Sequence, residues 1–103
     1  MSVQGKYIFR LPDDVAGLLR KLHPAIKANL KRALQFISED PFCGKALKDE
    51  LAGLRSYRVK RYRIIYRLME KDNILEIIAI GPRKSIYEET FRLISRQRSR
   101  LSS

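Results

Sequence analysis

The chain has 103 residues, of which 45% are hydrophobic, and it carries a net charge of +11. This length and this hydrophobic fraction predict a single folded domain over residues 1–103 and argue against a disordered chain. The positive charge is concentrated in the second half, where residues 52–103 hold 13 Lys/Arg against 5 Asp/Glu. Such a concentration favours a polyanionic or acidic partner.

The chain contains one cysteine and one histidine, which excludes an internal disulfide and a Cys/His zinc site. We therefore expect no metal and no other cofactor. The sequence shows neither the apolar core of a signal peptide nor a run of about 18 apolar residues that would span a membrane. We expect a cytoplasmic protein that does not associate with membranes.

The first half of the sequence predicts a strand followed by two helices. The strand lies within residues 3–10 and ends before Pro12. Asp13 or Asp14 is the expected cap of the first helix, and Pro24 breaks this helix and opens the second. Both helices carry one apolar stripe, formed in the first by Val15, Leu18, Leu19 and Leu22, and in the second by Ile26, Leu30, Ala33, Leu34 and Ile37. Two such helices with a short link predict an α-hairpin packed on a sheet.

The second half predicts three strands and a final helix. Residues 40–54 have the pattern of an irregular connector with a few buried leucines. Strands are expected at about 55–60, 62–70 and 73–80, the last of them apolar enough to be central in the sheet. A basic helix over 84–101 follows, with an apolar side formed by Ile86, Tyr87, Phe91, Ile94 and Leu101. The order β-α-α-β-β-β-α predicts an α+β domain whose small, mainly antiparallel sheet packs against the N-terminal α-hairpin.

Residues 55–67 are the most informative stretch, because they combine six Lys/Arg and three tyrosines with no carboxylate in a β-hairpin pattern. With a turn near residues 60–61, Arg58 and Lys60 share one face and Arg63 lies opposite them, at the roughly 5 Å spacing of cross-strand neighbours. The strand that ends before Arg83 brings this residue to the same edge, and Tyr87 reaches back over it. Four cations and a phenol are thus predicted to converge on a surface without carboxylates.

Such a surface suits RNA, because guanidinium groups bind phosphate and stabilise the charge of a pentacovalent transition state. Neighbouring cations also make it easier for an amine or a phenol to lose its proton, so that Lys60 or Tyr87 is a conceivable base. The same hairpin is equally compatible with a solvated basic face or a simple phosphate contact. Its tyrosines fit core packing better than base stacking, and neither His23 nor Cys43 is expected to be catalytic.

Two segments of the sequence resemble the RelE/ParE superfamily of toxin–antitoxin toxins. The first runs from Leu51 to Leu68 and contains an L-x-G-L motif, Tyr-Arg-Val and Tyr-Arg-Ile-Ile-Tyr; the second runs from Ile78 to Tyr87 and contains Ile-Gly-x-Arg and Ile-Tyr. The resemblance covers nearly the whole chain and implies a small basic α+β toxin neutralised by a cognate antitoxin. RelE-like members cut mRNA on the ribosome without a metal, whereas ParE-like members inhibit DNA gyrase.

The resemblance also implies roles for individual residues. Arg63 and Arg83 would hold the phosphate, Lys60 would be the base, and Arg83 or Arg58 would assist the leaving group. Tyr87 would stack on or orient the nucleotide. Arg58 stands where lysine is usual in this superfamily, and an arginine cannot act as a base near neutral pH. Further RNA contacts are predicted for the other cations of these segments, Arg55, Arg61, Arg67 and Lys84.

These residues favour an endoribonuclease acting by 2′-hydroxyl attack, that is, an mRNA interferase. A ParE-like gyrase inhibitor without nuclease activity is the alternative, and a catalytically silent binder of RNA or antitoxin is a third possibility.

Overall fold

A computed structural model describes residues 7–82 and 85–102, with the side chains of the last helix described as far as Arg96. The elements in chain order are β1 (Ile8–Arg10), α1 (Asp13–Lys21), α2 (Pro24–Glu39), β2 (Lys45–Ala46), the 3₁₀ turn η1 (Asp49–Leu51), β3 (Leu54–Val59), β4 (Tyr62–Met69), the 3₁₀ turn η2 (Glu70–Asp72), β5 (Ile74–Pro82) and α3 (Ile86–Ser102).

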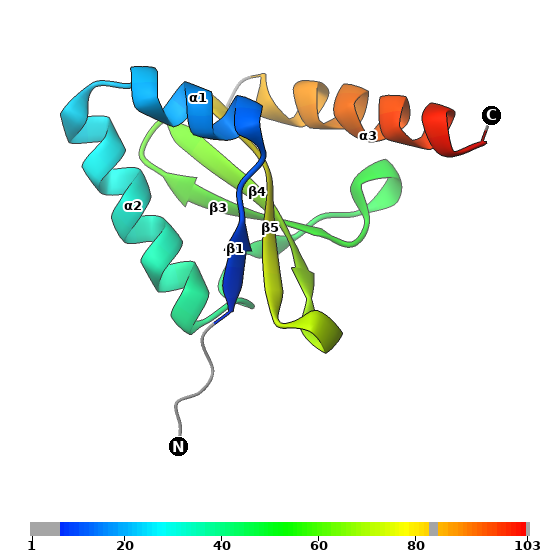
Figure 1. Ribbon diagram of the computed structural model, residues 1–103, viewed down its shortest axis with the longest axis horizontal. Coiled ribbons are helices and arrows are strands. Elements are labelled where there is room, and N and C mark those ends of the chain that lie inside the picture. The colour runs from blue at the N-terminus through cyan, green and yellow to red at the C-terminus, as the bar shows by residue number, and fades with distance from the viewer. Residues whose placement is uncertain (1–6, 83–84, 103) are drawn as a thin grey trace.

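The strands form one sheet in the order β1-β5-β4-β3-β2. Neighbouring strands are antiparallel except for β1, which lies parallel to β5. Figure 1 shows α1 and α2 as an α-hairpin beside the sheet and α3 extending away from the end of β5. The expected α+β architecture is confirmed.

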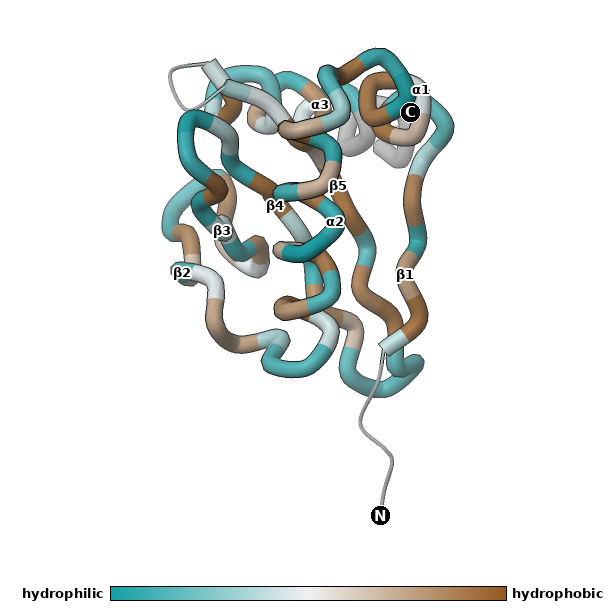
Figure 2. Tube along the Cα trace, turned by 90° about the vertical axis from the view of Figure 1, so that its left-hand side faces the viewer, coloured by the Kyte–Doolittle hydropathy of each residue, from teal (hydrophilic) through white to brown (hydrophobic). Residues whose placement is uncertain are grey.

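Helices cover both faces of the sheet, and each face has its own core. On one face, side chains of α1 and α2 such as Val15, Leu30 and Ile37 pack against Ile64 and Ile77 of the strands. On the other face, α3 contributes Ile86 and Ile94, which pack against Leu54, Ile65, Ile78 and Ala79. Burial from both sides explains the nearly continuous apolar run of β5, whose tube is mostly brown in Figure 2.

The pairing of β4 with β5 contains a bulge. Ile65 pairs with Ala79 and the next residue, Tyr66, pairs with Ile77, which leaves Ile78 as an extra residue in β5. Ile78 and Ala79 therefore both face α3, while Ile77 and Ile80 both face the α-hairpin.

The structure corrects several local expectations. The connector contains a two-residue strand, β2, which is too short to leave a periodic signal in the sequence. Pro12 occupies the cap position of α1, so the two aspartates expected to cap it lie inside the first turn. On α3, Phe91 is 43% exposed, whereas Thr90 is buried, and its hydroxyl donates to the Ile86 carbonyl oxygen.

Other expectations are confirmed. Pro24 opens α2, and His23 caps this helix through Nδ1, which accepts the backbone N–H of Ala25 at 3.1 Å. The three predicted strands lie within one or two residues of β3, β4 and β5. No helix within the described residues is both long and apolar enough to cross a membrane.

Candidate active site

The β3–β4 hairpin turns tightly at Lys60 and Arg61. Val59 pairs with Tyr62, so the turn contains only two residues, as the sequence predicts. Lys60 has a φ of 55°, a left-handed conformation that two-residue hairpins require and that L-residues other than Asn, Asp and Gly adopt at a cost.

Arg58 and Arg63 form a cross-strand pair directly behind this turn. Residues directly opposite each other in an antiparallel pair project to the same face of the sheet. Both arginines therefore lie on the face that α3 covers, as the sequence predicts. Arg58 is exposed and donates from Nε to the carbonyl oxygen of Lys60 at 3.5 Å.

Arg63 is half-buried and is held by α3 and β3 together. Its Nη1 donates to Oγ of Ser56 at 3.0 Å, and its guanidinium carbon lies 5.6 Å from the ring centroid of Tyr87, a cation–π contact. Its Nε is buried and has no hydrogen-bond partner among the described residues. The ion pairs found in that part of the chain also leave Arg63 without a carboxylate. The guanidinium thus retains a charge that no ion pair among the described residues neutralises.

Tyr87 reaches Arg63 because α3 approaches β5 closely at Gly81. A Cβ at Gly81 would lie 2.9 Å from Cδ1 of Ile86, so the absence of a side chain there allows the first turn of α3 to lie against the strand. The Tyr87 hydroxyl then comes within 3.1 Å of Ser56 Oγ. Figure 1 shows the hairpin turn, the end of β5 and the start of α3 at one end of the sheet.

The surface is not free of carboxylates, contrary to the sequence expectation. Oε2 of Glu89 lies 3.8 Å from the position that a Cβ at Gly81 would occupy, and Gly81 pairs with Arg63 across the sheet. The sequence placed Glu89 at a helix start, where the macrodipole alone accounts for it. The fold brings this helix start close to the cationic cluster formed by Arg58 and Arg63.

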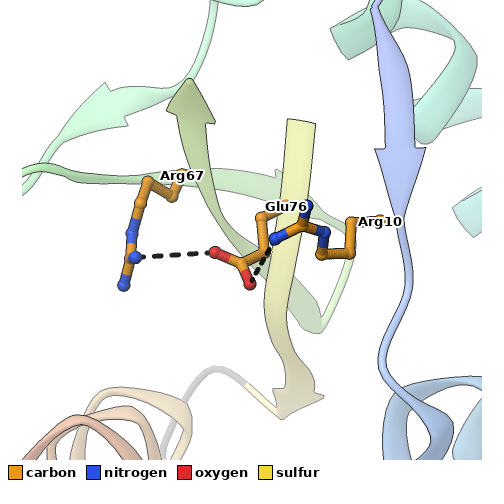
Figure 3. A network of polar contacts seen from close by, with 3 residues as sticks. All are labelled: Arg10, Arg67 and Glu76. Carbon is orange, nitrogen blue, oxygen red and sulfur yellow. Dashed lines mark ion pairs between the residues drawn. The ribbon is translucent and has the colours of Figure 1, made fainter. Parts of the chain in front are cut away.

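Two of the predicted RNA contacts lie away from Arg63 and have protein partners. Arg55 projects to the opposite face of β3, where Nη1 donates to the carbonyl oxygens of Gly44 at 2.7 Å and Phe42 at 3.2 Å. Arg67 lies further along β4 and pairs with Glu76, which also pairs with Arg10 across three strands, as Figure 3 shows. Both arginines are therefore engaged by groups of the protein itself.

The remaining predicted contacts divide into two groups. Arg61 is exposed in the hairpin turn, beside Lys60. Arg83 and Lys84 lie outside the described residues, so their predicted roles stay predictions.

The three tyrosines of the hairpin pack in the core, as the sequence favours. Tyr66 is completely buried; its hydroxyl donates to the Pro41 carbonyl oxygen at 2.7 Å and accepts the Gly44 N–H at 3.0 Å. Burial raises the pKa of Tyr66 to about 12, and the Gly44 N–H opposes this shift. Tyr57 and Tyr62 pack against the core on the α-hairpin side.

Sequence reasoning missed Ser56, which is buried at 2% exposure between Arg63 and Tyr87. The sequence did contain a signal for Ser56: it lies two residues before Arg58, so both side chains project to the same face of the strand.

Two grooves of opposite character flank the cluster. The groove between α2 and β3, of about 340 Å³, is lined by cations and aromatic rings without a carboxylate: Asn29, Arg32, Ala33, Phe36, Tyr57, Arg58, Val59 and Lys60. The groove between η1 and α3, of about 410 Å³, carries three carboxylates on a lining of Lys48, Asp49, Glu50, Leu51, Tyr87, Glu88 and Phe91. A polyanion is attracted by the first groove and repelled by the second.

The model of a family described as ParE-like toxin of type II bacterial toxin–antitoxin systems matches residues 12–90 of this sequence. The chain belongs to this toxin family. Toxin RelG of Mycobacterium tuberculosis is 34% identical to it over 83 residues, which are 79% of this chain and 95% of RelG. This toxin is therefore a RelE-like component of a type II toxin–antitoxin system.

Solved structures agree with this assignment. The toxin–antitoxin complex RelBE2 from M. tuberculosis contains a chain 32% identical to this toxin, with a TM-score of 0.68 and coverage of 76% of this chain and 99% of that one. A mutant of the E. coli toxin RelE in the free state has a TM-score of 0.72 and covers 89% and 97% of the two chains. Its identity is 17%, so this likeness shows the shared fold alone.

Proposed function

We propose that this toxin is an endoribonuclease that cleaves mRNA on the ribosome by attack of a 2′-hydroxyl on the adjacent phosphodiester. The observation that carries the proposal is Arg63, a half-buried guanidinium with an unpartnered Nε and no carboxylate partner among the described residues. A half-buried cation without a counter-ion costs free energy, and a bound phosphate would neutralise its charge.

In the proposed reaction the 2′-oxygen attacks phosphorus and gives up its proton, and the bond from phosphorus to the 5′-oxygen breaks. The 5′-oxygen takes up a proton, which leaves a 2′,3′-cyclic phosphate and a 5′-hydroxyl. Arg63 stabilises the extra negative charge of the phosphorane. Lys60 is proposed as the base that accepts the 2′-hydroxyl proton, and exposed Arg58 or Arg83 assists the leaving oxygen.

The groove between α2 and β3 supports a path for single-stranded RNA toward Arg58 and Lys60 at the hairpin turn. Phe36 is 49% exposed and lies 5.9 Å from Tyr57 between ring centroids, which provides an apolar surface beside the cations of the groove. Aromatic side chains on which bases can stack, beside a positive groove, are typical of single-strand recognition. Arg32→Ala should weaken RNA binding and reduce the slope of log affinity against log salt by about one.

The test is cleavage of a defined mRNA by the purified toxin, with and without programmed ribosomes, with the new 5′ ends mapped by primer extension. Cuts only in the presence of ribosomes support the proposal in full, and cuts on bare mRNA support a ribosome-independent nuclease. Arg63→Ala should abolish the cuts, whereas Arg20→Ala, the same change on exposed α1, should leave them unchanged. Intact mRNA from a toxic preparation would refute nuclease activity.

A gyrase inhibitor is the second candidate, because the matching family is described as ParE-like. Inhibition of DNA supercoiling by purified gyrase, with mRNA left intact, would favour this candidate over the nuclease.

We also propose a cognate antitoxin as partner. Similar toxins have been solved in complexes with antitoxins, among them RelBE2 of M. tuberculosis and RelE–RelB of Pyrococcus horikoshii OT3. A toxin with a net charge of +11 favours a partner segment that is acidic or amphipathic. Failure of the toxin to bind the product of an adjacent small gene would count against this proposal.

A further inference from the structure

Ser56 connects Arg63, which stabilises the phosphorane in the proposed reaction, to Tyr87. Its side chain is buried at 2% exposure. Its Oγ lies 3.0 Å from Nη1 of Arg63 and 3.1 Å from the hydroxyl oxygen of Tyr87. The three residues come from β4, β3 and α3, so that Ser56 is the point at which these elements meet.

The available protons determine the direction of this hydrogen-bonded chain. A guanidinium can only donate, so Arg63 occupies one lone pair of Ser56 Oγ. The Ser56 proton is buried and requires an acceptor, because an unpaired buried hydroxyl is costly. Within the part of the chain that the structure describes, the Tyr87 oxygen is the acceptor at hydrogen-bond distance. The chain therefore runs from Arg63 through Ser56 to Tyr87.

This direction leaves the phenolic proton of Tyr87 unused. Tyr87 is half-buried, so part of its side chain remains open to solvent or substrate. A tyrosine that accepts a hydrogen bond from Ser56 is disposed to donate its own proton to an oxygen on the open side.

We propose that Ser56 is a positioning residue, which fixes the Arg63 guanidinium and directs the Tyr87 hydroxyl to donate to an oxygen of the bound phosphodiester. The inference rests on the proposed nuclease function and deepens it. It assigns Tyr87 as a hydrogen-bond donor and leaves Lys60 as the base.

Cleavage kinetics with programmed ribosomes and a defined mRNA test the inference. Ser56→Ala should lower kcat about 10- to 100-fold, the range for a hydrogen bond involving a charged group, and change KM less than threefold. Ser56→Thr keeps the hydroxyl and should restore most of the activity. Ser38→Ala is the matched control, because Ser38 is also buried, at 8% exposure, but lies on α2.

Tyr87→Phe keeps the ring over Arg63 and removes only the hydroxyl. If Ser56 acts through its two neighbours, the double variant Ser56→Ala/Tyr87→Phe should be no slower than Ser56→Ala alone. Losses that multiply, or a Ser56→Ala enzyme as fast as the wild type, would overturn the inference.

A second measurement does not depend on activity. The ¹⁵N NMR signals of the Arg63 side chain, assigned with an Arg63→Lys variant, should exchange with water more slowly than those of exposed Arg32. Ser56→Ala should remove this protection, and Ser38→Ala should not. If the wild type cleaves no mRNA, the proposed function fails while these signals still test the positioning role. Equal exchange in Ser56→Ala and wild type would overturn that role even for an active nuclease.

Discussion

Replacement of Tyr66 by phenylalanine removes one hydroxyl that holds the loop before β2. This hydroxyl donates to the Pro41 carbonyl oxygen and accepts the Gly44 N–H, and all three residues are buried. Each buried backbone group left without a partner costs about 1–3 kcal/mol. Allowing for partial relaxation of the loop, Tyr66→Phe should lower the free energy of unfolding by about 2–4 kcal/mol at pH 7.

The cost of this substitution should depend on pH. The pKa of Tyr66 is about 12 in the folded protein, against 10 when unfolded. Because the folded pKa is raised, the stabilisation is complete below pH 10 and is lost as the pH rises from 10 toward 12. One pH unit above the unfolded pKa, the wild type should have lost about 1.4 kcal/mol from this residue. The variant lacks this contribution, so the difference in the free energy of unfolding between wild type and Tyr66→Phe should be smaller by that amount at pH 11 than at pH 7.

Urea denaturation of both proteins at pH 7 and pH 11 measures the gap directly. Tyr57→Phe is the matched control, because Tyr57 is only half-buried and its hydroxyl has no hydrogen bond among the described residues. This control should cost less than about 0.5 kcal/mol at either pH. A Tyr66→Phe variant as stable as the control, or a gap that is the same at both pH values, would refute the reasoning.

Three further predictions concern single sites. Gly44→Ala should lower stability by about 1–3 kcal/mol in thermal unfolding, because the added Cβ would lie 2.5 Å from the Tyr66 hydroxyl oxygen; an unchanged midpoint would contradict this contact. Lys60→Gly should raise stability by about 0.5 kcal/mol by relieving the left-handed φ of 55°, yet abolish mRNA cleavage. Retained cleavage in this variant would remove Lys60 from the proposed mechanism. Glu76→Gln should cost under about 1 kcal/mol in urea, since both ion pairs are partly exposed; a larger loss would mean that the triad holds β1 in place.

The sequence predicts the elements of this fold well wherever periodicity is strong. The apolar stripe of α2 specifies a helix and its buried face, because apolar residues spaced by three and four positions fit a helix. The apolar run of β5 specifies a strand that is buried on both faces. A strand of two residues such as β2 has no period, and its existence depends on the pairing of Lys45 with Ser56. Such long-range pairing cannot be obtained from local pattern.

The same distinction applies to the candidate site. Arg58 and Arg63 could be placed together from the sequence, because the turn fixes the register of the hairpin. The tertiary partners of the charged residues could not be predicted from the sequence. Arg55 donates to backbone carbonyl groups of a distant loop, and Glu89 comes close to Gly81, the neighbour of Arg63, through the packing of α3. Side chain type indicates which residues carry charge, but only packing determines which charges remain available to a substrate.

The extra residue of β5, Ile78, determines which face of the sheet the later residues of this strand occupy. Because Ile78 and Ala79 face the same side, every later position of β5 is shifted in phase relative to a regular strand. If the same residues alternated strictly, without the bulge, Gly81 would turn toward the α-hairpin and Ile80 would face α3 in its place. Ile86 and Tyr87 could then no longer approach the sheet. Deletion of Ile78 would instead remove the bulge and leave Ala79, Ile80 and Gly81 on the faces that they occupy now, so the site depends on where β5 accommodates its extra residue.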